Sequence, residues 1–313
     1  MIAPLRYSVR FVRYVVVAVL PLGFSTLAAP ISAQTQGSGS SSIVELTTRA
    51  DSGDGAAQRN LLQFLSHSQP SNGDYGLALE WLRRVASRNQ PDALYVLAYL
   101  YEHGHGLPRN YTKAVENYEA AAALGNDSAL NNLASLYQHG LGVDKNPGKA
   151  LNLYLDAAQK NNPVAQCNAA SMYLTGAGIA RDERQAFRWF RIAAELGYAP
   201  AQHNLAVLYF KGVGITADRE QALSWERSAA QKGDPDAESG LAYLYETGQG
   251  VPLDYVSAFA WYTRASAHGN HSADSRRENL SHLMTPSQLD RANALLSKPI
   301  SFPGLPAVHL LHI

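Results

Sequence analysis

One alanine recurs every 36 residues along most of the chain, and this spacing constrains the fold more than any other feature of the sequence. The positions concerned are Ala57, Ala93, Ala129, Ala165, Ala201, Ala237 and Ala273. Six complete repeats of equal length fit between the first and the last of them. A fixed period of this size is typical of arrays of stacked supersecondary units. Positions within a repeat are therefore counted from its alanine, which is position zero.

The first part of each repeat has the pattern of an amphipathic helix. Position four is apolar in every repeat, and position eight is Leu65 in the first repeat and tyrosine in the other five. Positions zero, four and eight lie on one face of a helix. We therefore expect a first helix in each repeat that buries an alanine, an apolar residue and a tyrosine.

A turn and a second helix are expected to follow. Five repeats have two glycines after the first helix, where a left-handed conformation can end it. Position seventeen is always Asp or Asn, whose side chain can cap the second helix. These residues are Asp74, Asn110, Asn146, Asp182, Asp218 and Asp254. The first repeat differs, because Ser68 and Pro70 stand where the glycine pair is found elsewhere.

The second helix also has a regular pattern and a regular end. Position twenty-one is alanine in every repeat, and the four tryptophans of the chain all stand at position twenty-four. We expect the alanines to allow close helix packing and the tryptophans to fill the space between repeats. Position thirty-two is Gly or Asn in every repeat, which is typical of a helix C-terminal stop.

These motifs resemble those of a known family. The stretch AQHNLAVLYFKGVGITADREQALSWERSAAQKGDPDA, residues 201–237, is similar to Sel-1-like repeats, which are relatives of the tetratricopeptide repeats. The resemblance extends over residues 43–297. It implies an all-α fold, a right-handed α-solenoid of six helix-turn-helix repeats, and a role in protein–protein interaction. The expected repeats are 57–92, 93–128, 129–164, 165–200, 201–236 and 237–272.

The ends of the array should be capped, because a terminal repeat lacks one neighbour. Residues 43–56 are expected to form an N-terminal capping helix, and residues 273–297 to form C-terminal capping helices. In the latter, Arg277 and Ser281 replace core residues, and Thr285 with Gln288 resembles a capping box. The proline-containing tail, residues 298–313, is either a frayed end or an apolar segment that folds back into the groove of this or another copy.

The N-terminus predicts export. Arg6, Arg10 and Arg13 precede an apolar run and a small-residue site, which is the pattern of a secretory signal in residues 1–33. We expect cleavage after Ala33, or else after Ala29, followed by a Gly/Ser-rich linker in residues 34–42. A periplasmic or secreted bacterial protein would result. The alternative is an uncleaved inner-membrane anchor formed by residues 11–29, which would be the chain's link to a membrane.

The charge balance argues against a nucleic-acid partner. The full chain has 26 basic and 26 acidic residues, and removing residues 1–33 removes three arginines and no acidic residue. A near-neutral protein lacks the basic surface that nucleic acids require. We expect a protein or peptide partner instead, in the cell envelope if the chain is exported.

A partner-binding surface is predicted on the first helices. Positions two, three, six and ten lie opposite the buried face, and the resemblance implies that this side lines a concave groove. The groove would be rich in amides, hydroxyls and aromatic rings, which suit an extended peptide. The candidate residues are Tyr95, Tyr99, Asn132, Asn168, His203, Asn204 and Tyr243. Alternatively, the asparagines bond to adjacent repeats and hold the curvature of the array.

The sequence contains no recognisable catalytic motif, and we expect neither a metal nor a cofactor. Pairs such as His103 and His105 lie in glycine turns without accompanying ligands. The single cysteine, Cys167, is expected to be an incidental small residue, although a surface thiol could link two copies, and His203 could lie beside it. Resemblance to secreted relatives leaves one enzymatic alternative, a cell-wall enzyme or a β-lactam-binding or β-lactam-hydrolysing protein.

Overall fold

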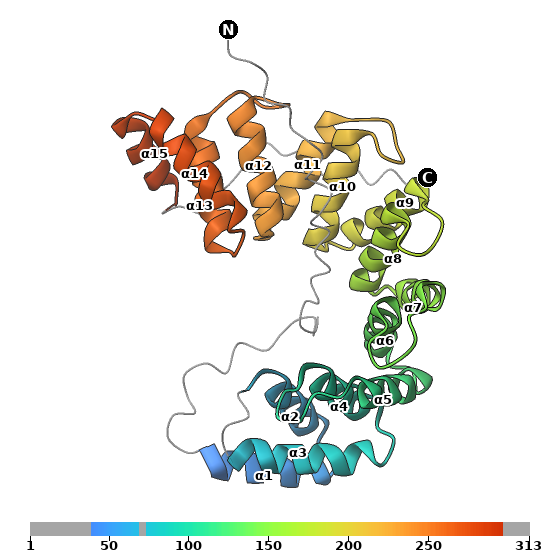
Figure 1. The fold of residues 1–313 in the computed structure, drawn as a ribbon. Helices are drawn as coiled ribbons and strands as arrows, with labels where there is room; N and C mark the ends of the chain where they lie inside the picture. Colours follow the sequence, from blue (N-terminus) through green and yellow to red (C-terminus); the bar gives the residue numbers. More distant parts are fainter. Residues whose placement is uncertain (1–38, 69–72, 297–313) are drawn as a thin grey trace. The chain divides into compact units, whose positions relative to one another are not determined.

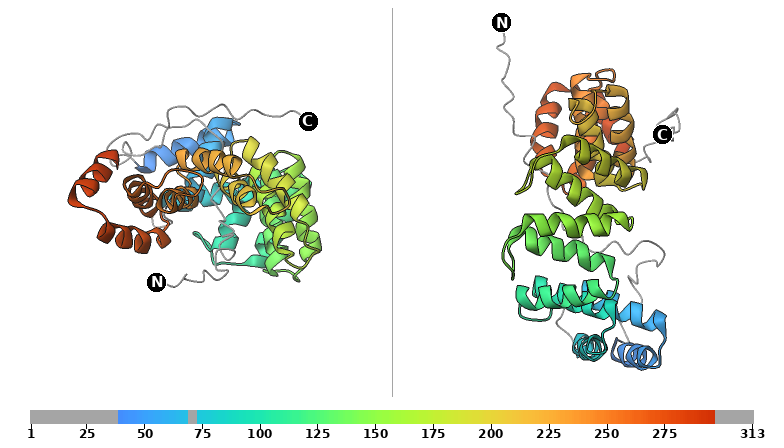
Figure 2. Two further views of the ribbon diagram at one scale, coloured as in Figure 1. Left: turned by 90° about the horizontal axis from the view of Figure 1, so that it is seen from above. Right: turned by 90° about the vertical axis from the view of Figure 1, so that its right-hand side faces the viewer.

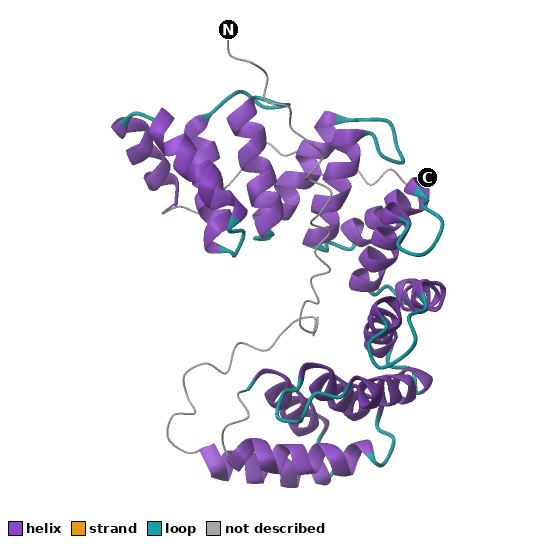
Figure 3. Cartoon of the chain, viewed as in Figure 1, coloured by secondary structure: helices purple, strands orange, loops and turns teal. Residues whose placement is uncertain are grey.

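The structure is a computed structural model that describes residues 39–68 and 73–296. These residues form fifteen α-helices joined by turns and loops, without strands (Figures 1 and 3). The chain divides into two compact units, residues 1–160 and 161–313, and each has hydrophobic clusters of its own. The predicted signal at 1–33, the turn around Pro70 and the tail at 298–313 lie outside the described residues.

The first unit contains the first three repeats. Its helices are α1 (Gly39–Asp51), α2 (Gly55–His67), α3 (Gly73–Ala86), α4 (Pro91–His103), α5 (Tyr111–Ala123), α6 (Asp127–His139) and α7 (Pro147–Gln159). Helices of one repeat pack together, and within this unit α3 packs against α4 and α5 against α6. Helix α1 packs against both α2 and α3 as an N-terminal cap. This cap begins at Gly39, within the stretch expected to be a linker, and ends at Asp51.

The second unit contains the last three repeats and the C-terminal cap. Its helices are α8 (Pro163–Thr175), α9 (Glu183–Glu195), α10 (Ala199–Lys211), α11 (Arg219–Gln231), α12 (Pro235–Thr247), α13 (Tyr255–Ala267), α14 (Ser272–Leu283) and α15 (Pro286–Leu296). The helices follow one another side by side, and both α14 and α15 pack on α13 (Figure 2). The capping box forms as predicted, because Thr285 and Gln288 exchange hydrogen bonds at 2.9 and 3.3 Å.

The helix starts and stops follow the predicted residues closely. In five repeats the position-seventeen side chain accepts a hydrogen bond from a backbone N–H in the first turn of the second helix. Asp74 is the exception, because α3 begins at Gly73 and already includes it. At position thirty-two, the four glycines have positive φ, and so do Asn89 (φ 57°) and Asn161 (φ 62°). Asparagine is among the few non-glycine residues that adopt this conformation readily.

The two glycines of each turn have different functions. The first ends the first helix in the left-handed conformation, and its N–H donates to the carbonyl of position seven. At Gly142 and Gly214, the second brings the turn against the start of the second helix of the preceding repeat. A Cβ at Gly142 would overlap the backbone of Tyr111, and a Cβ at Gly214 would lie 2.7 Å from the carbonyl carbon of Glu183. At these two turns, successive repeats therefore meet at a point where only hydrogen fits.

The predicted core is correct at most positions and wrong at position eight. The alanines at positions zero and twenty-one and the apolar residues at position four are buried. The five tyrosines at position eight are only half-buried. The deeper core residue is the preceding one, at position seven: Leu100, Leu136, Met172, Leu208 and Leu244. Among the tryptophans, Trp81, Trp225 and Trp261 are buried, whereas Trp189 is half-buried.

Substitution of the second glycine of a turn tests the contact between repeats. We expect Gly214→Ala to lower the free energy of unfolding by about 2–4 kcal/mol, because strain at φ 72° adds to overlap with Glu183. The matched control is Gly250→Ala, where φ is 82° and no atom lies within 4 Å of the added Cβ. It should cost about 1 kcal/mol. Urea unfolding measures both, and equal losses would contradict the role given to the close contact.

Candidate functional site

The predicted groove residues of the first unit differ in how far they reach the surface. Tyr95 is 5% exposed and packs against Tyr118, with ring centroids 5.7 Å apart. Asn132 donates to the hydroxyls of Tyr118 (3.0 Å) and Tyr95 (3.4 Å). Tyr99 is half-buried and stacks on the His103 ring at 4.1 Å. Tyr95 and Asn132 thus help to join repeats. Tyr99, in contrast, has an aromatic ring that is partly exposed to solvent.

The groove residues of the second unit also vary. Asn168 and Asn204 are half-buried, and Asn204 donates to the Pro200 carbonyl of its own helix at 2.9 Å. Tyr243 is half-buried, and the Arg276 guanidinium of the capping helix α14 lies 5.0 Å from its ring centroid. The His203 ring contacts the Glu226 carboxylate of the second helix of its repeat. Three of the predicted residues thus lie in the first unit and four in the second.

A buried position that the sequence analysis missed lies at the junction between repeats. Position twenty-five of the second helix is fully or almost fully buried in all six repeats. Its residues are Leu82, Tyr118, Tyr154, Phe190, Glu226 and Tyr262. The three tyrosine hydroxyls each donate to the residue at position nine of the same repeat, at 2.6–3.1 Å. Those acceptors are Glu102, Gln138 and Glu246.

Position nine changes with position twenty-five. Where Phe190 has no hydroxyl, position nine is the apolar Leu174, and where Glu226 stands, it is Phe210. From the second repeat to the sixth, the polar acceptor is therefore present only where the second helix supplies a hydroxyl donor. In the first repeat, Leu82 has no hydroxyl, and Ser66 at position nine donates to the Leu62 carbonyl at 2.9 Å. This is the expected result of hydrogen-bond satisfaction, since an unpaired buried acceptor is costly.

Glu226 is a carboxylate at a core position, and the chain provides both a partner and space for it. His203 Nδ1 lies 3.0 and 3.2 Å from the two carboxylate oxygens of Glu226. In the next repeat, Gly240 stands where four other repeats have asparagine, and a Cβ there would overlap the Glu226 carboxylate. Alignment of the six repeats would have revealed Glu226 as the one charged residue at this position.

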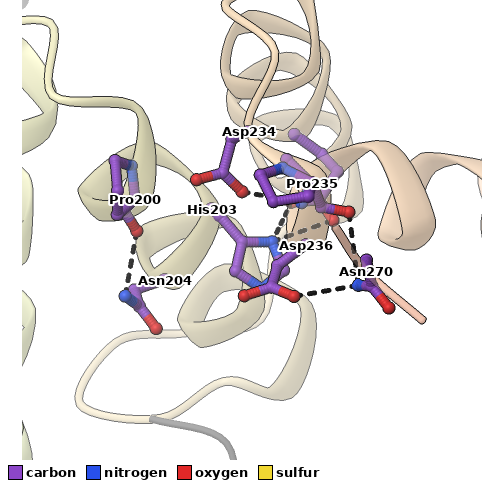
Figure 4. Close-up of polar contacts among 9 residues, drawn as sticks. Pro200, His203, Asn204, Asp234, Pro235, Asp236 and Asn270 are labelled. Atoms are coloured by element: carbon purple, nitrogen blue, oxygen red, sulfur yellow. Dashed lines mark hydrogen bonds and ion pairs between the residues drawn. The ribbon is translucent and has the colours of Figure 1, made fainter. Parts of the chain in front are cut away.

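Further carboxylates surround the histidine. Asp234 caps α12 by accepting from the Ala237 N–H at 2.9 Å, and Asp236 accepts from the Asn270 side chain at 2.9 Å (Figure 4). Burial lowers the pKa of His203, but the charge of Glu226, with smaller effects of Asp234 and Asp236, more than reverses this and raises that pKa to about 9. Burial also raises the pKa of Glu226, and the charge of His203 opposes this. The raised pKa of His203 favours an imidazolium at neutral pH, 3.0 Å from the Glu226 carboxylate.

The lone cysteine has no role in this cluster as a nucleophile. Cys167 is buried, and burial raises the pKa of its thiol well above the ordinary value, which disfavours the thiolate. The hypothesis of a surface thiol that links two copies is therefore wrong, and His203 pairs with Glu226. Among the described residues, no group of three or more His, Cys, Asp or Glu side chains is arranged to hold a metal ion. None of the described helices is long and apolar enough to cross a membrane.

The ion pair predicts a pH dependence of stability. Folded protein keeps the His203 proton up to about pH 9, whereas unfolded protein loses it near the ordinary pKa of 6.5. The stabilisation is thus complete below pH 6.5 and is lost as the pH rises to about 9, by roughly 2–3 kcal/mol. Urea unfolding at several pH values measures this loss. The double variant His203→Gln/Glu226→Gln should lack it, and an unchanged slope in that variant would contradict the assignment.

Comparisons with known proteins agree with this architecture. The model of the Sel1 repeat family matches six consecutive segments: 57–89, 91–126, 127–162, 163–198, 199–234 and 235–270. The period is the predicted one, and five of the segments begin two residues before the alanine. No curated protein matches the sequence.

Solved structures give further matches. A Sel1 repeat protein from Oxalobacter formigenes is 25% identical, with a TM-score of 0.62, over 84% of this chain and 98% of that one. The protective antigen c5321 of uropathogenic Escherichia coli, which displays an SLR fold, is 22% identical over 82% and 70% (TM-score 0.45). Immunity protein Pa5087 from Pseudomonas aeruginosa is 25% identical over 66% and 81% (TM-score 0.46).

Proposed function

Because the chain belongs to the Sel1 repeat family, we propose that it is an exported scaffold that binds an extended segment of a cell-envelope protein on its first helices. Sel1 repeats typically mediate protein–protein interaction, and an all-α solenoid presents side chains at regular intervals for this purpose. The part of the proposal that concerns the binding surface comes from the burial pattern of the first helices.

Positions six and ten form a recurring, partly open strip, which we call the first-helix face. From the second repeat to the sixth, every position-six residue is half-buried and every position-ten residue is exposed. The position-six residues are Tyr99, Ser135, Ser171, Val207 and Tyr243, and the position-ten residues are His103, His139, Thr175, Lys211 and Thr247. The regular exposure of this strip in both units is the observation that carries the proposal.

The chemistry of the first-helix face suits a polypeptide backbone. It contains no carboxylate, and Lys211 is its one lysine. In four repeats the polar group at position ten bonds to the backbone carbonyl of position six, at 2.7–3.0 Å. The His103 and His139 rings must donate from Nδ1 in these bonds, which leaves Nε2 as an acceptor for a partner's N–H. Tyrosines add contact area at low entropic cost.

Site-specific photocrosslinking tests the face directly. A photoreactive phenylalanine at Tyr99, Ser135, Val207 or Tyr243 should crosslink one partner in cells that make the protein. The controls are the exposed second-helix residues Glu116 and Arg188, where the same probe should give no product. In addition, Tyr99→Ala or Tyr243→Ala should weaken partner binding about tenfold or more, as loss of an aromatic contact commonly does. Crosslinks from Glu116 or Arg188 alone would contradict the proposal.

Export is supported by the sequence of residues 1–33, which has the charge, apolar run and small residues of a secretory signal. We propose cleavage after Ala33 and release into the periplasm or beyond. N-terminal sequencing of the protein isolated from its own cells should begin at Gln34, and the protein should fractionate with periplasmic or secreted material. An intact N-terminus in the membrane fraction would instead favour the anchor formed by residues 11–29.

The enzymatic alternative receives no support from the described residues. A cell-wall hydrolase or a β-lactam-hydrolysing protein needs an activated nucleophile or an activated water. Cys167 is buried with a raised thiol pKa, and His203 is held by Glu226 within the fifth repeat. A binding function explains better why the chain repeats the same partly open first-helix face.

A further inference from the structure

A cavity of about 220 Å³ opens in the first unit beside the junction of the first and second repeats. Arg83 of α3, Tyr101 of α4 and Lys113 of α5 line it, together with loop residues 107–110, which include Arg109. We call this site the basic cavity. Three cationic side chains therefore surround one space that is open to ligand.

The three cations of the basic cavity have no carboxylate partner. Within the described residues, neither Arg83, Arg109 nor Lys113 has a carboxylate oxygen within 4.0 Å. The sequence contains no Asp or Glu outside those residues, so the rest of the chain has no acidic side chain to offer. The Lys113 ammonium lies 5.3 Å from the Tyr101 ring centroid, and the Arg109 guanidinium lies 5.6 Å from that of Tyr111. These cation–π contacts leave the N–H donors available.

The equivalent site one repeat later contains a carboxylate that the basic cavity lacks. There, Tyr137, Lys145 and Lys149 take the places of Tyr101, Arg109 and Lys113, but Glu119 takes the place of Arg83. Lys149 lies 3.5 Å from the Glu119 carboxylate, and the Tyr137 hydroxyl donates to the same carboxylate at 2.9 Å. Lys149 also contacts the Tyr137 hydroxyl and ring. The second site therefore holds a carboxylate between its lysine and its tyrosine.

We propose that the basic cavity binds a carboxylate side chain of a partner polypeptide, which takes the place that Glu119 fills in the next repeat. Lys113 and the Tyr101 hydroxyl would contact it as Lys149 and Tyr137 contact Glu119, and the two arginines would add forked N–H donors. The N-terminus of α5 is not required, because Asn110 already caps it by accepting from the Lys113 N–H at 3.0 Å. The ligand is a polypeptide on the basis of the proposed function; the need for an anion comes from the cavity itself.

A binding experiment with a defined probe tests the preference for an anion separately from the identity of the partner. The probe is an acetylated, amidated peptide of alternating Glu and Gly, and its control has Gln in place of Glu. Side-chain NMR signals of the arginines in the full mature chain report where the probe binds. We expect the Glu peptide to perturb Arg83 and Arg109, the Gln peptide to leave them unchanged, and the affinity to fall as salt is raised.

A reciprocal exchange of residues gives the decisive variants. Arg83→Glu copies the next repeat and supplies an internal carboxylate, so it should weaken binding of the Glu peptide at least tenfold. Glu119→Arg makes the opposite change and should create a second binding site. Arg188→Glu, on the exposed surface of the second unit, alters the net charge equally and should have no effect. Arg83→Gln serves as a milder variant if Arg83→Glu is poorly folded by circular dichroism.

Three results would overturn the proposal. The first is equal binding of the Glu peptide by the wild type, Arg83→Glu and Arg83→Gln. The second is tighter binding of inorganic phosphate than of the peptide, which would assign the cavity to a phosphate group. The third is peptide-independent binding to phosphatidylglycerol vesicles that Arg83→Glu abolishes, which would assign it to a lipid surface. Failure of the photocrosslinking experiment would leave these measurements unaffected, so the two proposals fail separately.

Discussion

Contact between successive repeats depends on residues that have little or no side chain. The buried alanines at positions zero and twenty-one allow the helices to approach, and in several turns the second glycine brings the loop against the preceding repeat. At Gly142 and Gly214 that contact is with backbone atoms, which cannot move aside as a side chain can. An insertion in either of these turns would displace the glycine from its contact, so the contact favours a turn of constant length there.

The backbone framework is constant, but the side chains at the junctions between repeats change together. Position twenty-five is Tyr, Phe, Leu or Glu, and the residues that face it change with it. Tyr118 has Glu102 and Asn132 as partners, whereas Glu226 has His203 and the space left by Gly240. Each junction thus satisfies its own buried polar groups, so the hydrogen-bond chemistry can change while the backbone geometry stays the same. One consequence is that Glu226, alone among the six residues at position twenty-five, forms an ion pair, with His203 of its own repeat.

The sequence predicts the repeat well because its period, its capping residues and its positive-φ residues act locally. Asn89 and Asn161 end helices as the glycines do, and Asp182 or Asp218 start them, for reasons contained in a few neighbouring residues. Burial is harder to predict. Positions four, seven and eight lie on the same helix face, and only the neighbouring helix decides that Leu136 is covered more completely than Tyr137. Glu226 looks like a surface residue until Gly240, fourteen residues later, is placed against it.

The predicted binding residues differ in their exposure for the same reason. Asn132 bonds to side chains of the preceding repeat and His203 to Glu226 on the second helix of its own repeat, whereas the position-six residues stay partly open. A helical wheel of one helix cannot distinguish these cases, because it contains no information about the next repeat. The repeats can be compared with one another instead. When equivalent positions differ, as with Arg83 and Glu119, one repeat shows which group the other lacks. A repeat protein thereby contains its own reference structure, and an unbalanced charge in one repeat identifies the chemistry that a partner must supply.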